Sequence, residues 1–246
     1  MSQGFHIRPI ILFAVLLTLA LPAVALAGSS YTLHPSGFCE HSYSAWKAHQ
    51  GEPDSKGNDS QALYFQKMTS TASFAAGVAV IKGFEGLPVS QLTGLSWDHR
   101  EDGHCGAGAP RWNVGLNLAG GGTTTVFLGC NAASHNEAGT GSGHGWCHDE
   151  QPSPASTLPM GATIRYLAIV FDEGNDNPNP PPAGCAQEQL VGGFVYLDNI
   201  TVTVNGVPHV WTGASDNSNN QTIWQDPTGE AYVESLIGAP VSTLFP

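Results

Sequence analysis

Apolar and polar residues alternate along several short stretches of the chain. The clearest stretch is residues 111–118, where Trp112, Val114, Leu116 and Leu118 alternate with polar or small residues. Because successive side chains of a β-strand point to opposite faces, this pattern predicts a strand with one buried face and one solvent-facing side. Three glycines follow at 120–122, and residues 123–129 are again typical of a strand. The two stretches therefore predict a β-hairpin.

Other apolar runs predict further strands. These runs are residues 73–82, 87–100, 163–171 and 194–204, and a tail at 207–211 that follows the Asn205-Gly206 turn signal. In the second run, Leu95, Trp97 and His99 share one predicted face. Residues 163–171 are apolar on both faces, which predicts a central strand covered on both sides, or one lying between a sheet and a loop.

Three segments lack a regular pattern. Residues 28–67 are polar and irregular, apart from a short strand predicted near 31–33. Residues 131–161 are rich in Gly, Ser, His and Pro, and we interpret them as a long loop, which in a compact domain is usually functional or mobile. Residues 172–184 form an acidic loop rich in Asn and Pro. No helical periodicity stands out after residue 27.

Strands separated by turn signals at short intervals favour an all-β fold, a two-layer antiparallel β-sandwich with long Gly/His/Pro-rich loops, and a closed barrel is the alternative. The chain of 246 residues holds 30 Gly and 17 Pro, and only 11% of its residues are charged. Gly and Pro are the poorest helix formers, so the composition also favours strands and turns. We expect one sandwich domain at 28–246, with an irregular N-terminal segment at 28–70.

The first 27 residues predict an export signal. Arg8 precedes an apolar run that ends in Ala25-Leu26-Ala27, the small-x-small pattern of a cleavage site. A membrane anchor is the alternative, but the run is short for a bilayer helix. We expect a secreted protein, extracellular or, in a Gram-negative bacterium, periplasmic, with no membrane association after signal removal. The net charge of −12 argues against a nucleic-acid partner.

Five cysteines follow the signal, which allows two disulfides and leaves one cysteine over. The predicted hairpin brings Cys105 and Cys130 together at its open end. Pairing of these two leaves Cys147–Cys185 as the expected second bridge and Cys39 outside both. The alternative is Cys130–Cys147, which would close the His-rich segment.

Two polar segments contain side chains of metal-ligating type. The His-rich segment carries imidazoles and carboxylates that suit zinc or copper, but their spacing is irregular, so a solvated loop is the preferred interpretation; its residues are His135, Glu137, His144, Cys147, His148, Asp149 and Glu150. The acidic loop offers hard oxygen ligands that suit calcium, without the spacing of an EF-hand; its candidates are Asp172, Glu173, Asn175, Asp176 and Asn177. A turn-forming loop is the alternative there.

Two tryptophans are candidates for ligand contact. Trp146 and Trp224 lie in polar, turn-rich sequence, so we expect their rings to be exposed and able to stack on sugars, whereas Trp97 and Trp112 lie in the apolar register of strands.

Asp198 lies inside a strongly apolar strand. Either it shares the buried face and needs partners, or a bulge at 198–199 turns Val195 and Leu197 inward together with Ile200. We assign Asp198 a structural role.

Three short motifs carry a family resemblance: Phe-Asp-Glu-Gly at 171–174, Tyr-Leu-Asp-Asn-Ile-Thr-Val at 196–202, and Cys-Gly-Ala-Gly-Ala-Pro-Arg-Trp at 105–112. Over about residues 72–205 the chain resembles uncharacterised secreted bacterial β-sandwich proteins, and more loosely it is similar to jelly-roll carbohydrate-binding modules. The resemblance implies a jelly-roll-like sandwich that recognises an extracellular carbohydrate or another extracellular ligand.

A non-catalytic binding protein is therefore the favoured interpretation. The alternatives are a secreted glycoside hydrolase or lyase, and a structural extracellular protein without a small ligand. Neither a G-x-S-x-G nor an H-E-x-x-H motif is present, so the sequence identifies no catalytic residue.

Overall fold

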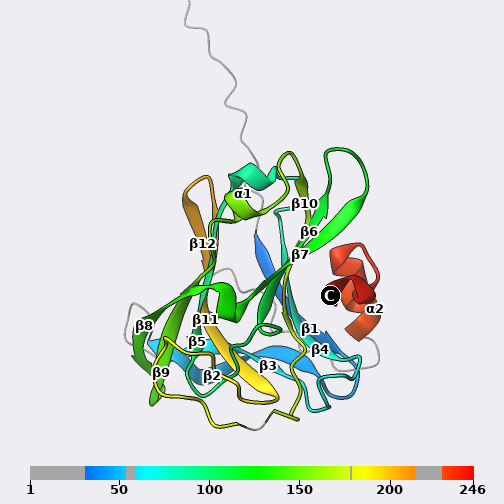
Figure 1. The fold of residues 1–246 in the computed structure, drawn as a ribbon. Coiled ribbons are helices and arrows are strands. Elements are labelled where there is room, and N and C mark those ends of the chain that lie inside the picture. Colours follow the sequence, from blue (N-terminus) through cyan, green and yellow to red (C-terminus); the bar gives the residue numbers. More distant parts are fainter. Residues whose placement is uncertain (1–30, 54–58, 178, 214–228) are drawn as a thin grey trace, which may run out of the picture.

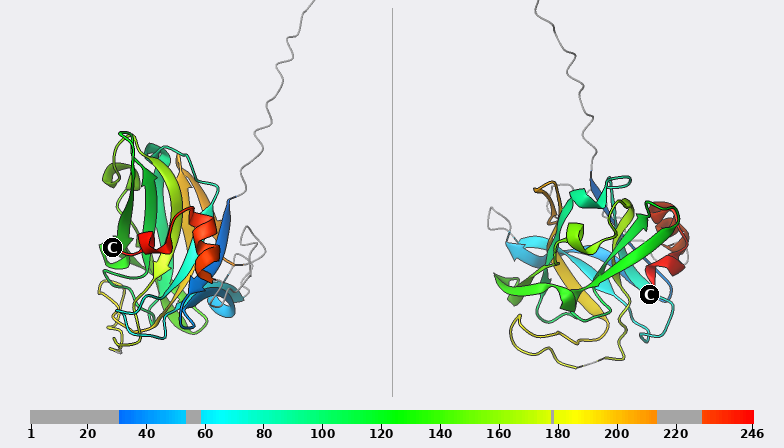
Figure 2. Two further views of the ribbon diagram at one scale, coloured as in Figure 1. Left: turned by 90° about the vertical axis from the view of Figure 1, so that its right-hand side faces the viewer. Right: turned by 45° about the horizontal axis from the view of Figure 1, so that its top comes forward.

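The structure is a computed structural model that describes residues 31–53, 59–177, 179–213 and 229–246. It shows two antiparallel β-sheets packed face to face (Figures 1 and 2). The predicted two-layer antiparallel β-sandwich is confirmed. The predicted export signal at 1–27 lies outside the described residues.

The smaller sheet has five strands in the order β1-β4-β10-β6-β7. Its strands are β1 (Thr32–Phe38), β4 (Ala76–Lys82), β6 (Arg111–Asn117), β7 (Thr123–Gly129) and β10 (Thr163–Phe171). The predicted hairpin of β6 and β7 is present, with Arg111 opposite Gly129 and Asn117 opposite Thr123.

The larger sheet has seven strands in the order β2-β3-β11-β5-β9-β8, with β12 also paired to β11. Its strands are β2 (Tyr43–Pro53), β3 (Asp59–Gln66), β5 (Leu92–Arg100), β8 (Ser134–Gly141), β9 (His144–Glu150), β11 (Phe194–Val204) and β12 (Val207–Trp211). The Asn205-Gly206 turn joins β11 and β12 as predicted.

The main core lies between the two sheets. Trp97 of β5 and Trp112 of β6 stack across it, with ring centroids 5.0 Å apart, and neither is exposed. The same core buries Leu95 and Ile169, so residues from both sheets contribute to one apolar cluster. Burial of such large rings supplies much of the apolar area that stabilises a sandwich.

The outer face of the smaller sheet is covered, which the sequence did not predict. The helix α2 (Gly229–Ile237) and a 3₁₀ turn (Val241–Leu244) pack on it, as Figure 2 shows. Arg111 and Asn113, expected on a solvent-facing side, are buried and donate hydrogen bonds to the backbone oxygen of Leu244. The expectation that β10 is covered on both sides is confirmed.

The prediction that residues 28–70 are irregular is wrong, because this segment contains β1, β2 and β3. Buried polar residues conceal the strand pattern. The hydroxyl of Ser44 accepts a hydrogen bond from the Ser36 N–H, and its single proton lies within reach of the carbonyls of both Ser36 and Val78. A serine that satisfies backbone groups can occupy a core position, and it interrupts the apolar alternation on which the prediction rested.

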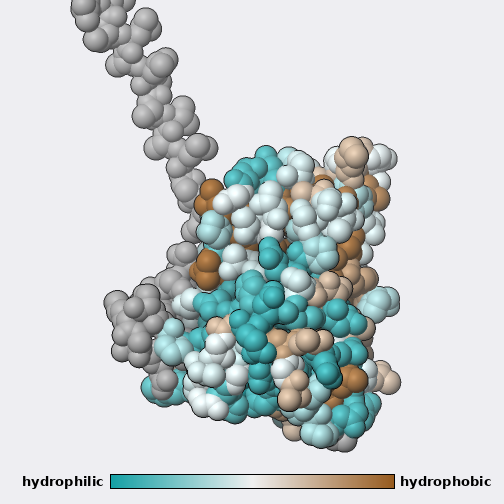
Figure 3. Space-filling model, turned by 60° about the vertical axis from the view of Figure 1, so that its left-hand side comes forward, coloured by the Kyte–Doolittle hydropathy of each residue, from teal (hydrophilic) through white to brown (hydrophobic). Residues whose placement is uncertain are grey.

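The prediction that residues 131–161 form a loop is also wrong. The segment forms the hairpin of β8 and β9 and a short helix α1 (Pro154–Thr157). The hairpin pairs with β5, yet Asp149, which is buried, and its partner His135 are polar. Figure 3 shows a mostly hydrophilic surface over the lower half of this side of the molecule. Apolar periodicity therefore does not mark these strands.

The predicted disulfides are confirmed. Cys105 bonds to Cys130 and Cys147 bonds to Cys185, whereas Cys39 is in neither bridge. The first bridge joins the two ends of the β6–β7 hairpin. The second ties β9, which lies between β5 and β8, to the segment that precedes β11.

Candidate functional site

Four aromatic rings lie together on the outer face of the larger sheet. We call this set, Tyr43, Tyr64, Phe194 and Tyr196, the aromatic patch. Tyr64 lies 5.9 Å from Tyr43 and 4.7 Å from Tyr196 between ring centroids, and Phe194 lies 6.1 Å from Tyr196. All four side chains are half-buried, so part of each ring reaches solvent.

Strand register explains how residues from β2, β3 and β11 meet. Tyr64 is directly opposite Tyr196, and Gln66 is opposite both Tyr43 and Phe194. Residues two apart on a strand share a face, and direct cross-strand neighbours lie about 4.5–5.5 Å apart. The aromatic patch is therefore a property of strand pairing and is not visible in any one stretch of sequence.

Two cations flank the aromatic patch. The Lys47 Nζ lies 5.2 Å from the Tyr43 ring centroid and donates to the Tyr43 hydroxyl at 3.2 Å. The Arg100 guanidinium lies 3.6 Å from the Tyr196 centroid, within the range of a cation–π interaction. Its nitrogens also donate to both carboxylate oxygens of Asp102, at 2.6 and 3.0 Å, and to Gln50 at 2.7 Å. Arg100 is therefore held rigidly against the ring.

A group of carboxylates adjoins the aromatic patch on the same face. The Asn199 Nδ2 donates to Asp98 at 2.7 Å and to Glu52 at 2.9 Å, and His148 contacts the other Asp98 oxygen at 2.6 Å. We call Glu52, Asp98, His148 and Asn199 the acid–histidine group. Asp98 is opposite Asp198 on β11 and His148 on β9, so register again brings these residues together.

The environment shifts two pKa values in this group. Burial, a hydrogen bond with Asp98 and the negative charges of Asp98 and Asp198 raise the pKa of Glu52 to about 8. The hydrogen bond to Asp98 raises the pKa of His148, although burial opposes it. Near pH 7 Glu52 is therefore mostly protonated and can donate a proton, while Asp98 lies between an imidazole and a carboxylic acid.

Asp198 organises the backbone beside this group. It is 1% exposed, and its two oxygens accept the N–H groups of Glu52 at 2.8 Å and Asn199 at 2.7 Å. The register shifts after Asp198, and Asn199 has φ of +46°, which marks a bulge. Val195, Leu197 and Ile200 all face the core, as the bulge interpretation predicted.

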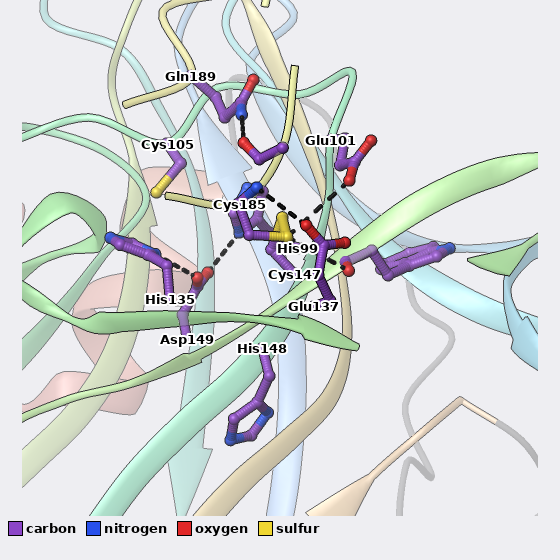
Figure 4. Close-up of a disulfide and its surroundings, with 12 residues drawn as sticks. His99, Glu101, Cys105, His135, Glu137, Cys147, His148, Asp149, Cys185 and Gln189 are labelled. Carbon is purple, nitrogen blue, oxygen red and sulfur yellow. Dashed lines mark hydrogen bonds and ion pairs between the residues drawn. A yellow bond between two sulfur atoms is a disulfide. The ribbon is translucent and has the colours of Figure 1, made fainter. Parts of the chain in front are cut away.

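A second polar cluster lies on the inner face of β5 and β9. Asp149 contacts His99 at 2.5 Å and His135 at 2.7 Å, and it accepts the Trp97 indole N–H at 2.8 Å. Figure 4 shows His148 pointing to the opposite side of β9 from Asp149. The His-rich segment thus does not supply one site, because alternation along β9 divides its residues between two faces.

Charge complementarity stabilises this inner cluster. Burial alone would raise the pKa of Asp149, but the neighbouring His99 and His135 hold that pKa below its usual value. The contact with Asp149 in turn raises the pKa of His135. Such mutual stabilisation is the usual condition under which a carboxylate remains charged in a protein interior.

The expectation that Trp146 is exposed is wrong. Its side chain is 0% exposed, and its indole N–H donates to the Gly141 carbonyl at 3.2 Å within the β8–β9 hairpin. Turn-rich sequence suggested an exposed ring, but the turn belongs to a hairpin that buries it. Trp224 lies outside the described residues.

The acidic loop after β10 directs its oxygens to protein groups. Asp172 pairs with the guanidinium of Arg111 at 2.6 and 2.8 Å. Asp176 accepts from the N–H and hydroxyl of Thr71, and an oxygen of Glu173 lies 3.2 Å from the same hydroxyl. The Asn175 amide donates to the Met68 carbonyl, and Asn177 accepts from Asn179. Calcium binding at this loop stays a prediction.

Comparisons with known proteins identify no family for the chain. No protein-family model, no curated protein and no solved structure matches it. Within the described ranges, no helix is both long and apolar enough to cross a membrane. Functional inference therefore rests on the geometry of the two clusters and the aromatic patch.

Proposed function

We propose that the protein binds carbohydrate on the outer face of its larger sheet, over the aromatic patch. One observation carries the proposal: four partly exposed rings from three strands lie in contact beside fixed charged groups. Export of the chain, which residues 1–27 predict, is part of the proposal. The two disulfides support it, because such bonds persist in oxidising compartments.

The chemistry of the face suits a sugar better than a purely apolar ligand. An aromatic face offers flat apolar area to the C–H side of a sugar ring, while hydroxyls need donors and acceptors at the rim. Here Lys47 and the acid–histidine group supply such groups next to the rings. Burial and the neighbouring Tyr196 and Tyr43 raise the pKa of Tyr64, and its protonated hydroxyl donates to the Gln66 side chain at 3.1 Å, which leaves the hydroxyl oxygen as an acceptor for a sugar hydroxyl.

A glycan array with the mature protein, with and without calcium, tests this proposal. We expect binding to a defined set of glycans, and we expect Tyr64→Ala and Tyr196→Ala each to weaken it at least tenfold, or about 1.4 kcal/mol. Tyr232→Ala is the matched control, since this tyrosine lies on α2, the helix that covers the smaller sheet. Failure of every glycan to bind, or equal losses in all three variants, would reject the proposal.

A second candidate function is glycoside hydrolysis, favoured by the acid–histidine group. Glu52 and Asp98 accept hydrogen bonds from the same nitrogen, and the pKa of Glu52 is raised to about 8, as a general acid requires. The hydrogen bond between Glu52 and Asp98 places the two carboxyl groups closer than the ~5–5.5 Å of retaining enzymes and the ~6.5–9.5 Å of inverting enzymes, so the spacing assigns neither stereochemical outcome. Glu52→Gln should abolish hydrolysis and leave binding intact; hydrolysis retained by this variant would reject the assignment.

A further inference from the structure

The strand β7 ends the smaller sheet, and among the described strands it is the edge strand that has no feature to block further pairing. An edge strand leaves N–H and C=O groups unpaired, and proteins usually protect it with proline, a charge or a bulge. The other edge strands contain such residues: Pro35 in β1, Lys47 in β2, Glu137 in β8 and Pro208 in β12. β7 is uncharged, contains no proline and pairs with β6 without a register shift. Its free side is therefore suited to an added strand.

The hydrogen bonds around the hairpin show which groups of β7 face its free side. The Cys130 N–H, just after β7, donates to the Pro110 carbonyl at 2.9 Å. Because hydrogen-bonded and non-hydrogen-bonded pairs alternate between antiparallel strands, odd-numbered residues of β7 direct their N–H and C=O groups away from β6. The Gly129 carbonyl agrees, since it accepts from the Gln151 side chain at 3.0 Å.

Three residues of β7 keep both backbone groups available on this side. They are Thr123, Thr125 and Phe127, which we call the open edge. Within the described ranges, no group hydrogen-bonds to their N–H or C=O from the free side of the sheet. The three residues are exposed or half-buried, so a partner strand can reach them.

A pocket of about 270 Å³ lies beside the open edge. The side chains of the open edge line it, together with Arg165 and Phe245. Figures 1 and 2 show the C-terminus of the chain close to the β6–β7 hairpin. Residues two apart on a strand share a face, so the same three residues offer backbone groups to an added strand and side chains to the pocket. Every second side chain of an added strand would therefore lie next to this pocket.

Arg165 gives the pocket a positive charge. Arg100 and Arg111 each form an ion pair with an aspartate. Arg165 instead donates to the backbone carbonyl of Gly238, and none of the described carboxylates forms an ion pair with it. A guanidinium stays charged and binds carboxylates through paired hydrogen bonds. The pocket is therefore complementary to a carboxylate side chain.

We propose that an extended peptide with a carboxylate side chain adds to the open edge as a sixth strand of the smaller sheet, and that its carboxylate binds Arg165. In strand addition, main-chain hydrogen bonds provide affinity and pockets for alternate side chains provide specificity. The side chains between the acidic positions would meet Val126 and Leu128, which are partly buried against the main core, so apolar residues suit those positions. The site does not depend on the proposed carbohydrate site, which lies on the other sheet.

A second copy of the chain is a less suitable occupant of the open edge. Its β7 is uncharged, so pairing of two copies through this strand would leave Arg165 without a carboxylate. Each chain also has a net charge of −12, which opposes the association of two copies. Charge complementarity thus favours a short acidic strand from a different protein.

Binding of designed peptides to the mature protein tests the proposal, with fluorescence anisotropy as the measurement. Each probe is an acetylated and amidated peptide of alternating Thr and Val with one Glu, which is moved along the peptide so that every register is sampled. We expect binding, and we expect Gln or Lys in place of Glu to weaken it about 10–100-fold, as loss of a hydrogen-bonded ion pair predicts. N-methylation of alternate residues should abolish binding in one of the two possible phases only, because alternate N–H groups of a strand face its neighbour.

Variants of the protein separate the two kinds of contact. Arg165→Gln should remove the preference for Glu over Gln peptides. Lys82→Gln is the matched control, because Lys82 lies on the same sheet and donates to the Leu236 carbonyl but does not line the pocket. Thr125→Pro should abolish binding, since it removes an N–H of the open edge, whereas Thr125→Val keeps that N–H and should bind. Circular dichroism checks that each variant is folded, and glycan binding should be unchanged in all of them.

Any of three results would overturn the proposal. One is that no peptide of the series binds. Another is that peptides N-methylated in either phase bind equally, which would mean that the pocket takes a carboxylate side chain without strand pairing. The third is a dimer in analytical ultracentrifugation that Thr125→Pro abolishes, which would assign the open edge to a second copy. Failure of the unaltered protein to bind glycans would reject the carbohydrate proposal alone.

Discussion

Replacing Asp198 by alanine should destabilise the protein without any ligand present. The Asp198 carboxylate accepts the backbone N–H groups of Glu52 and Asn199, and it is 1% exposed. Each donor left without an acceptor costs about 1–3 kcal/mol. Because Glu52 is only half-buried, water can reach its N–H and offset part of that loss. We therefore expect the free energy of unfolding to fall by about 2–4 kcal/mol.

Urea denaturation at pH 7 measures this loss, with melting temperature as a second readout. Asp176→Ala is the matched control, because Asp176 also accepts a backbone N–H, that of Thr71, but lies on an exposed loop. Asp176→Ala should lower the free energy of unfolding much less than Asp198→Ala does. An Asp198→Ala protein that unfolds at the same urea concentration as the unaltered chain, yet loses binding or hydrolysis, would show that Asp198 serves the chemistry instead of the backbone.

Three other predictions concern Glu52, the second disulfide and the acidic loop. Since the pKa of Glu52 rises from 4.5 to about 8 on folding, its contribution to stability is full below pH 4.5 and is lost as pH rises towards 8. Glu52→Gln should therefore flatten this part of a plot of unfolding free energy against pH. An unchanged slope in the variant would contradict the pKa shift. Cys147→Ala/Cys185→Ala, which opens a 38-residue separation, should lower the free energy of unfolding by about 4 kcal/mol in urea titrations; a loss below 1 kcal/mol would count against it. Calcium at millimolar concentration should raise the melting temperature of chelator-treated protein if the acidic loop binds it, and no rise means no site there.

Strand alternation and turn signals were enough to predict the sandwich, because the apolar strands carry the core. The run at 163–171 became the central strand β10, and the 111–118 and 123–129 stretches became a hairpin whose ends the first disulfide joins. These features depend on residues close together in sequence, or on pairs that a hairpin necessarily brings together. The local sequence pattern was therefore sufficient to predict these strands and the first disulfide.

The site could not be predicted in the same way. The aromatic patch joins Tyr43 and Tyr64 to Phe194 and Tyr196, which lie 130–153 positions later in the sequence, through registers that no local pattern specifies. β8 and β9 were missed because Asp149 and His135, which bury charge by pairing with each other, look like loop residues in a hydrophobicity pattern. Polar residues that satisfy one another inside a sandwich are invisible to apolar periodicity, although the density of His and Asp in this segment was itself a signal.

Two carboxylate–imidazole pairs lie back to back across β5 and β9. Asp98 and His148 meet on the outer face, whereas His99 and Asp149 meet on the inner face, and Asp98 and His99 are adjacent in sequence. The two pairs therefore share the backbone hydrogen bonds that join these strands. A substitution that shifts β5 against β9 would disturb both pairs, even though the pairs lie on opposite faces of the sheet. Isosteric changes such as Asp149→Asn, which remove one charge and keep the shape of the side chain, are for this reason more informative than alanine at either face, because they alter one pair and leave the strand pairing of the other in place.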